Sequence, residues 1–193
     1  MSTLLNFIRL ILPTLVAVVV LASLSGPAVA QMPPDTQFLD DIRDRNYHET
    51  MAYLVNGGTP NARDYKGIPA IVAAARIGDA GMTKELIKYG ANPNLTVKET
   101  GMSALMQSAA RGNVLVIAVL LTNGANIDLQ DNLGETALIK AVKEGKREIV
   151  MHMLNAGADI YLTDYTGYSA YDHAMRGRDN RIKNTMKKAA ASR

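Results

Sequence analysis

Glycine residues recur in this 193-residue chain at a spacing of 33 or 34 positions. The first series opens a short motif of small and apolar residues: Gly67-Ile-Pro-Ala-Ile, Gly101-Met-Ser-Ala-Leu, Gly134-Glu-Thr-Ala-Leu and Gly167-Tyr-Ser-Ala-Tyr. Two further series keep the same phase, and their members are Gly78, Gly112 and Gly145, then Gly90, Gly124 and Gly157. Self-similarity at a period of roughly 20–50 residues indicates a chain built by stacking copies of one structural unit. This repeat constrains the fold more than any single motif does.

Each unit is predicted to contain two short helices that end at glycine. The first helices are predicted over residues 70–77, 104–111 and 137–144, and the second over 82–89, 114–123 and 147–156. Ser103, Thr136 and Ser169 precede first helices, where a hydroxyl can accept hydrogen bonds from free N–H groups. The later glycines follow helix ends, where a left-handed backbone favours this residue. The polar stretch before each new unit is long enough for a projecting, hairpin-like loop.

Apolar residues stand at equivalent positions in successive units. In the first helices they are Ile71, Ala74, Ala75, Leu105, Ser108, Ala109, Leu138, Ala141 and Val142, with serine as the one polar member. In the second helices they form the pairs Leu86-Ile87, Leu120-Leu121 and Met153-Leu154. Spacings of three and four place such residues on one face of a helix. One unit cannot bury this face alone, so the units are expected to stack.

The pattern G-x-T-A-L-x-x-A, followed by a helix and G-A-D/N-x-N/D, resembles the ankyrin repeat over about residues 34–193. The resemblance implies an all-α solenoid of helix-turn-helix units with hairpin-like loops. It implies capping repeats at about 34–66 and 167–193 and three full repeats at about 67–166. No unit keeps the histidine of the family's Thr-Pro-Leu-His motif, so apolar packing is expected to be the main link between units. One extra residue between Asn94 and Gly101 predicts a longer loop there.

The two ends of the array are predicted to act as caps. Three apolar residues should form the buried face of the first helix: Phe38, Leu39 and Ile42. Arg43 beside them is expected to point to solvent. At the other end, Ile182 and Met186 fall where a second helix is buried, with lysines on the opposite face. Terminal repeats need such a polar outer face for solubility.

The first thirty residues are predicted to be a secretory signal peptide, as in an exported bacterial protein. Arg9 gives a charged start, residues 10–24 are almost wholly apolar, and Ala28-Val29-Ala30 is a small-residue cleavage site. The apolar run is shorter than the roughly 20 residues of a membrane-spanning helix. Cleavage is therefore expected after Ala30, leaving a periplasmic domain of residues 31–193. The alternative is an uncleaved segment that anchors the domain.

Few residues suggest chemistry. The absence of cysteine excludes disulfides, thiolate metal sites and thiol nucleophiles. The three histidines show no metal-binding spacing, although His152 between two methionines leaves a periplasmic copper site as an alternative. Asp172-His173 could be half of a hydrolytic triad, but no G-x-S-x-G serine accompanies it. The sequence therefore predicts a non-catalytic protein without a metal or cofactor.

Charge is distributed unevenly along the chain. Residues 176–193 hold seven basic residues and one acidic residue, whereas residues 31–175 hold thirteen basic and seventeen acidic. The basic end indicates a solvated last helix. The alternative is an envelope-associated factor that places this helix on anionic lipid. We expect no nucleic-acid partner and a monomeric state.

In ankyrin-like proteins, partners usually contact the loop tips and the exposed face of the first helices. Carried onto this chain, the resemblance implies a partner-binding surface of Tyr65, Lys66, Arg76, Met102, Arg111, Asn132, Leu133, Lys143, Tyr165 and Tyr168. Glu135, Lys140 and Arg176 are expected on the same surface. Tyrosine beside arginine is typical of interface hot spots. The sequence thus predicts a protein–protein interaction module that binds or stabilises an acidic or mixed protein partner.

Overall fold

The computed structural model describes residues 34–192, and the predicted signal peptide with its cleavage site lies outside this range. Within the range the chain forms ten helices and no strand. They are α2 (Pro34–Arg43), α3 (Tyr47–Val55), α4 (Ala70–Ile77), α5 (Ala80–Lys88), α6 (Ala104–Arg111), α7 (Val114–Thr122), α8 (Ala137–Lys143), α9 (Arg147–Asn155), α10 (Ala170–Arg176) and α11 (Asn180–Ala191). None of these helices is long and apolar enough to cross a membrane.

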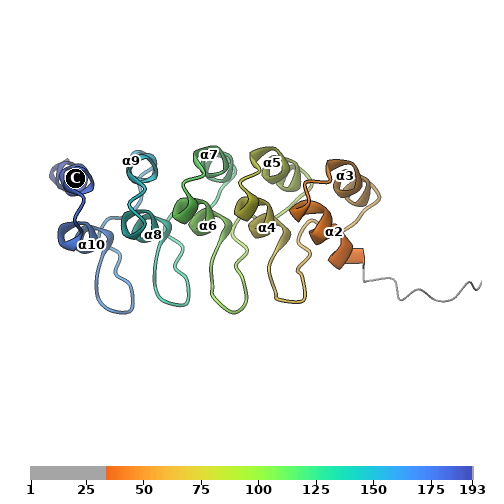
Figure 1. Ribbon diagram of the computed structural model, residues 1–193, viewed down its shortest axis with the longest axis horizontal. Coiled ribbons are helices and arrows are strands. Elements are labelled where there is room, and N and C mark those ends of the chain that lie inside the picture. Colours follow the sequence, from red (N-terminus) through yellow and green to blue (C-terminus); the bar gives the residue numbers. More distant parts are fainter. Residues whose placement is uncertain (1–33, 193) are drawn as a thin grey trace, which may run out of the picture. The chain divides into compact units, whose positions relative to one another are not determined.

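The helices of residues 34–192 form five pairs that stack in a row (Figure 1). We call α2, α4, α6, α8 and α10 the inner helices and α3, α5, α7, α9 and α11 the outer helices. Each inner helix packs on its outer partner and on the next inner helix. The long loops project from the side of the inner helices. This arrangement confirms the predicted all-helical stack of repeated units.

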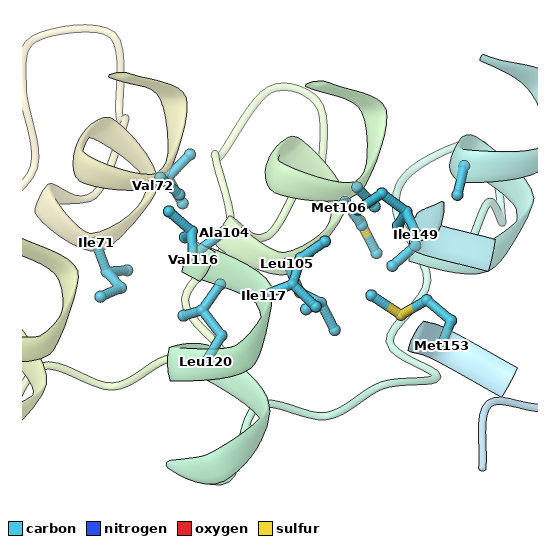
Figure 2. Packing of buried hydrophobic residues seen from close by; sticks show 14 of the residues in the cluster. Ile71, Val72, Ala104, Leu105, Met106, Val116, Ile117, Leu120, Ile149 and Met153 are labelled. Carbon is cyan, nitrogen blue, oxygen red and sulfur yellow. The ribbon is translucent and has the colours of Figure 1, made fainter. Parts of the chain in front are cut away.

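The core runs through the stack without interruption. Figure 2 shows Leu105 of α6 beside Ile117 of α7, with Met153 of α9 nearby. The predicted apolar positions of the first helices are all buried. In the second helices only the first member of each pair is fully buried, as Leu86 is, while Ile87 is half-buried. The second member of each pair points about 100° away from the first, so it packs against the edge of the core and is covered only in part.

Side-chain caps fix where the helices begin. Ser103, Thr136 and Ser169 each accept a hydrogen bond from a backbone N–H in the first turn of the helix that follows, which confirms the predicted caps. Asp79 and Asp179 cap the outer helices α5 and α11 in the same way. Because the Asp79 carboxylate accepts from Met82 N at 2.9 Å, α5 starts two residues earlier than predicted.

Hydrogen bonds between neighbouring loops supplement the apolar core. Asn61 Nδ2 donates to Gly90 O at 3.2 Å, and Asn61 Oδ1 accepts from Asn92 N at 2.8 Å. Asn94 makes the same two contacts with the next unit. Asp128 makes only the accepting contact, because a carboxylate has no hydrogen to donate. The expectation that apolar packing is the main link is therefore incomplete, since polar side chains also join the loops.

A second set of contacts joins the loops closer to their tips. Arg63 donates to Thr96 O at 2.6 Å, and Gln130 donates to Thr163 O at 2.8 Å. Thr96, which stands at the equivalent position in the unit between them, is too short to reach across in this way. There the amide of Asn132 bridges instead, donating to the carbonyl of residue 99 at 2.9 Å. Long polar side chains thus align successive loops.

The loop with the extra residue is wider than the others, as predicted. Gly101 N donates to Val97 O, four residues earlier, at 2.8 Å. The equivalent glycine in each other loop donates to the residue three positions earlier, as Gly134 N does to Asp131 O at 2.9 Å. The insertion is accommodated within a single turn, and the helices that follow keep their stacking.

Gly134 allows a close contact between two loops, and its substitution gives a test of that contact. Its φ is +75°, and a Cβ there would lie 2.8 Å from Tyr165 N and 2.7 Å from the Tyr165 ring. Gly124 has a φ of +81° with nothing within 4 Å of such a Cβ. We expect Gly124→Ala to lower the free energy of unfolding by about 1–2 kcal/mol, the cost of a left-handed backbone. Gly134→Ala should lower it further, because Tyr165 N is held by Leu133 O at 3.0 Å. Equal losses in urea denaturation would show that this contact adds nothing to stability.

Candidate functional site

The loops that precede α4, α6, α8 and α10 project side by side and end in exposed turns (Figure 1). We call residues 64–67, 98–101, 131–134 and 164–167 the finger tips. Three of them expose a large apolar or aromatic side chain: Tyr65 is 81% exposed, Leu133 63% and Tyr165 76%. Tyr165 N donates to Leu133 O, so the last two tips are in direct contact. The tips therefore present an interrupted row of apolar side chains to solvent.

An aspartate shapes three of the four finger tips. These residues are Asp64, Asp131 and Asp164, and all three are buried. Asp131 Oδ1 accepts from Leu133 N and Glu135 N, both at 2.9 Å, and the other two fold their loops in the same way. Their recurrence three residues before the loop glycine is visible in the sequence and is the signal that could have identified them. These carboxylates hold the exposed side chains of the tips in place.

A basic side chain pairs with each of these aspartates. Arg43 of α2 pairs with Asp64 and with Asp40, the latter at 2.7 Å. The expectation that Arg43 points to solvent is therefore wrong, because the buried carboxylate of Asp64 draws its guanidinium onto the first loop. Lys140 of α8 pairs with Asp131, and His173 of α10 pairs with Asp164. Three finger tips are thus tied to the inner helices, the first and third by ion pairs and the last by a hydrogen bond between His173 and Asp164.

Lys140 and Glu135 form an internal network in place of the exposed surface predicted for them. Lys140 is only 9% exposed, and its Nζ lies 2.7 Å from Asp131 Oδ2 and 2.5 Å from Glu135 Oε2. Glu135 also pairs with Lys143. Burial would lower the pKa of Lys140, but the carboxylates of Asp131 and Glu135 outweigh it and raise that pKa. Burial would likewise raise the pKa of Glu135, but the two lysines lower it. Both residues are therefore charged and already paired within the chain.

The next unit places different chemistry at the same positions. His173 stands 33 residues after Lys140, and its Nε2 lies 2.7 Å from Asp164 Oδ2. Arg176 stands 33 residues after Lys143, and its Cζ lies 3.9 Å from the centroid of the Tyr168 ring. A cation–π contact thus replaces the pair of Lys143 with Glu135. Tyr168 and Arg176, both expected on the binding surface, are brought together by this contact.

The residues considered for metal or hydrolytic chemistry serve other purposes. His152 is exposed while Met153 is buried in the core, so the two side chains do not share one surface. Asp172 accepts a hydrogen bond from the Ser169 hydroxyl at 2.5 Å and completes the cap of α10. Among residues 34–192, no cluster of three or more histidine, aspartate or glutamate side chains is arranged to hold a metal ion.

The pair of Asp164 and His173 predicts a loss of stability in acid. Burial alone would raise the pKa of Asp164, but hydrogen bonds from Thr166, His173 and the backbone of Tyr168 outweigh it and hold this pKa well below its usual range. A carboxyl with a depressed pKa stabilises the folded state above its unfolded pKa of about 3.9, and this contribution is lost as pH falls through the folded pKa.

We therefore expect the free energy of unfolding to fall as pH drops below about 4, and Asp164→Asn to remove part of that slope. Thr166→Val removes one of the hydrogen bonds to Asp164, so it should remove a smaller part. Urea midpoints measured across this pH range test the expectation. A slope in Asp164→Asn equal to that of the wild type would contradict it.

Three of the predicted binding residues line one cleft. Lys66, Arg76 and Met102 border a hollow of about 260 Å³ between the first and second finger tips, with Ile68 and Val97 among its apolar walls. Lys66 Nζ also lies 5.3 Å from the Tyr65 ring centroid. The structure therefore gathers Lys66, Arg76 and Met102 into a single concave patch, with the Tyr65 ring beside Lys66.

The remaining predicted residues are more dispersed. Leu133 and Tyr165 lie on touching finger tips, and Asn132 is exposed although its amide is used in bridging two loops. Lys143 is half-exposed but pairs with Glu135. Arg111 lines a separate hollow with Lys146 and Arg147 near the turn after α6. The predicted surface is thus two patches near the finger tips with Arg111 apart from them, and its role in binding stays a prediction.

Comparison with known proteins agrees with the geometry. Residues 42–131 match the family described as "Ankyrin repeats (3 copies)", and residues 120–174 match "Ankyrin repeats (many copies)". The chain is similar to neurogenic locus notch homolog protein 1 of Danio rerio, at 46% identity over 76 residues, which is 39% of this chain and 3% of that protein. It is also similar to neurogenic locus notch homolog protein 2 of Homo sapiens, at 41% identity over 109 residues, which is 56% of this chain and 4% of that protein. The chain therefore spans only a few per cent of the length of these relatives.

Proposed function

Because the chain belongs to the ankyrin-repeat family, whose repeats are protein-interaction modules, we propose that it binds another protein through its finger tips and inner helices. In this proposal the chain holds or stabilises its partner without catalysis and without a cofactor. The apolar run of residues 10–24 and the small-residue site at Ala30 support export to the periplasm as the setting.

The observation that carries the proposal is the row of exposed side chains on rigid finger tips. Tyr65, Leu133 and Tyr165 are largely exposed, yet the loops beneath them are fixed by buried aspartates and by bonds between loops. Aromatic side chains with few rotatable bonds lose little conformational entropy when a partner covers them. A row of this kind gains more from burial in an interface than a row on mobile loops would.

Charge on this side of the molecule supports an acidic or mixed partner. Arg76 and Arg111 are exposed and form no ion pair with any residue in the described range. Arg176 lies over the Tyr168 ring and makes no ion pair within residues 34–192, although its charge also acts on the Asp172 carboxyl and helps to lower its pKa. Arginine can bind a carboxylate through two parallel hydrogen bonds, which favours acidic side chains opposite these positions.

An affinity-capture experiment tests the proposal. The chain is expressed with its complete sequence and a C-terminal tag in its own cells, and proteins retained on it are identified after mild cross-linking. A variant with Tyr65, Arg76, Arg111 and Tyr165 replaced by alanine should lose the retained partner while its circular dichroism stays unchanged. A matched variant changes four exposed positions of the outer-helix layer, Lys84, Lys88, Tyr89 and Met151, and should keep it. Retention by the first variant, or loss by both, would count against this surface.

A further inference from the structure

The last joint of the stack is built differently from the two before it. At the joint between the α4–α5 and α6–α7 pairs, the Asn113 side chain covers Gly78 and donates to Ala75 O at 3.2 Å. At the next joint the aliphatic part of Lys146 lies over Gly112. At the last joint a Cβ placed on Gly145 would meet nothing within 4 Å. The turn between α10 and α11 therefore does not cover the turn between α8 and α9.

The sequence explains why this joint is open. Gly78, Gly112 and Gly145 have φ of +73°, +86° and +66° and complete compact turns. The residue 33 positions after Gly145 is Arg178. The turn glycine of the last unit, Gly177, therefore stands one position earlier than the turn glycines of the other units. Gly177 adopts an extended conformation, with φ −62° and ψ 172°. The chain thus leaves α10 in a wider turn than in the other units.

The open joint forms a cleft of about 410 Å³. Its floor is apolar and includes Val142, Ala174 and Ile182, and its rim carries the basic side chains Lys143, Arg176 and Arg178. One acid and one histidine also border the cleft, and both are engaged within the chain. Asp179 accepts hydrogen bonds from the first N–H groups of α11, and His173 pairs with Asp164.

The cations at the rim differ in how far the chain itself neutralises them. Lys143 pairs with Glu135, and Arg176 lies on the Tyr168 ring. Arg178 is exposed and makes no ion pair within residues 34–192. Residues 176–193 hold seven basic residues and one acidic residue, so no cluster of acids in this part of the chain balances the rim. The cleft therefore has a net positive rim over an apolar floor.

We propose that this cleft binds an acidic segment of the protein partner, with a carboxylate held between Arg176 and Arg178 and a neighbouring apolar side chain on Val142 and Ile182. The inference rests on the proposed function, because the segment belongs to the partner protein. A polypeptide fits better than a membrane surface, because the cleft is recessed. None of the large apolar side chains exposed in the described range lies on α11, so that helix has no anchor for the acyl region of a bilayer.

Peptide binding tests this inference directly. The probe is a short fluorescein-labelled peptide of alternating glutamate and leucine, and its anisotropy is followed on titration with the full-length chain. Binding should be at least about tenfold weaker for the same peptide with glutamine in place of glutamate, a difference of about 1.4 kcal/mol. Arg178→Ala should weaken binding of the acidic peptide by a similar factor. Arg181→Ala removes an equal charge from the neighbouring helix outside the cleft and should leave binding unchanged.

The site of binding is checked by NMR, because the amides of Gly145 and Gly177 line the cleft and should shift on addition of the peptide. Equal losses in Arg178→Ala and Arg181→Ala, or shifts that avoid these glycines, would overturn the inference in favour of diffuse attraction by the basic end. Displacement of the peptide by phosphatidylglycerol vesicles would overturn it in favour of a lipid surface.

The variant with alanine at Tyr65, Arg76, Arg111 and Tyr165 separates the two proposals. It should still bind the peptide, since none of the four residues lines the cleft. A chain that captures its partner through the finger tips but does not bind the peptide would retain the proposed function and lose this inference.

Discussion

Replacing Lys140 with methionine is expected to lower the free energy of unfolding by about 3–5 kcal/mol, the usual cost of removing one partner of a buried ion pair. Its ammonium group lies between the carboxylates of Asp131 and Glu135, and all three side chains are buried. Without it, the Asp131 carboxylate has no cation opposite it, and Glu135 keeps only Lys143. Because Asp131 also shapes the third finger tip, the loop that presents Leu133 should loosen as well.

Urea denaturation of Lys140→Met measures this effect, and two further variants interpret it. Lys143→Met, whose side chain is half-exposed, should cost only about 0–1 kcal/mol, because solvent screens its pair with Glu135. Adding Asp131→Asn and Glu135→Gln to Lys140→Met should recover part of the loss, since no buried charge is then left unpaired and Lys143, which loses its partner, is half-exposed to solvent. A loss below about 1 kcal/mol in Lys140→Met would show that the network contributes little to stability.

Replacing Leu105 with alanine should lower the free energy of unfolding by about 2–5 kcal/mol, because it deletes most of a buried side chain and leaves a cavity. Leu105 belongs to α6, which packs on both α4 and α8 in the middle of the stack (Figure 2). In a stacked array each unit is stabilised mainly by its nearest neighbours. A cavity in the central unit therefore weakens the joints on both sides.

Leu115 provides the matched control for this substitution. It is also a helix leucine, on the adjacent α7, but is 73% exposed. Leu115→Ala should change the free energy of unfolding by no more than about 0.5 kcal/mol. Similar losses in the two variants, measured by urea denaturation, would contradict the burial assigned to Leu105.

The repeat made much of the fold predictable from sequence. Glycine and apolar positions recur in phase because each unit must pack on its neighbours in the same way. The period of the sequence therefore predicts which residues are buried. The period accordingly predicts Leu105, Ile182 and Met186 in the core, and all three are buried. The wider loop before Gly101 followed from a single extra residue.

The ion pairs could not be predicted in this way. Whether Lys140 points to solvent or to Asp131 depends on how a finger tip folds back onto an inner helix, and periodicity carries no information on that contact. The same limit applies to Arg43, which pairs with a carboxylate 21 positions away. At both positions a buried carboxylate decides the orientation of a base that a helical pattern assigns to solvent.

Part of the candidate site could also be predicted from the sequence. The exposed tyrosines at the finger tips follow from loop position and family resemblance, and the structure does expose them. The cleft at the last joint depends on Gly177 standing one position early, which is visible in the sequence. Its consequence becomes clear only from the open space over Gly145.

Site-specific photo-cross-linking tests the central claim, that a protein partner is bound at the finger tips, most directly. A benzophenone side chain is placed at Tyr65 or Tyr165 on the finger tips, and at Tyr89 or Val55 in the outer-helix layer, in the chain expressed in its own cells. Our account predicts a single cross-linked protein from both finger-tip positions and none from the two outer positions. Cross-links from Tyr89 or Val55 alone would contradict it and place the partner on the opposite face.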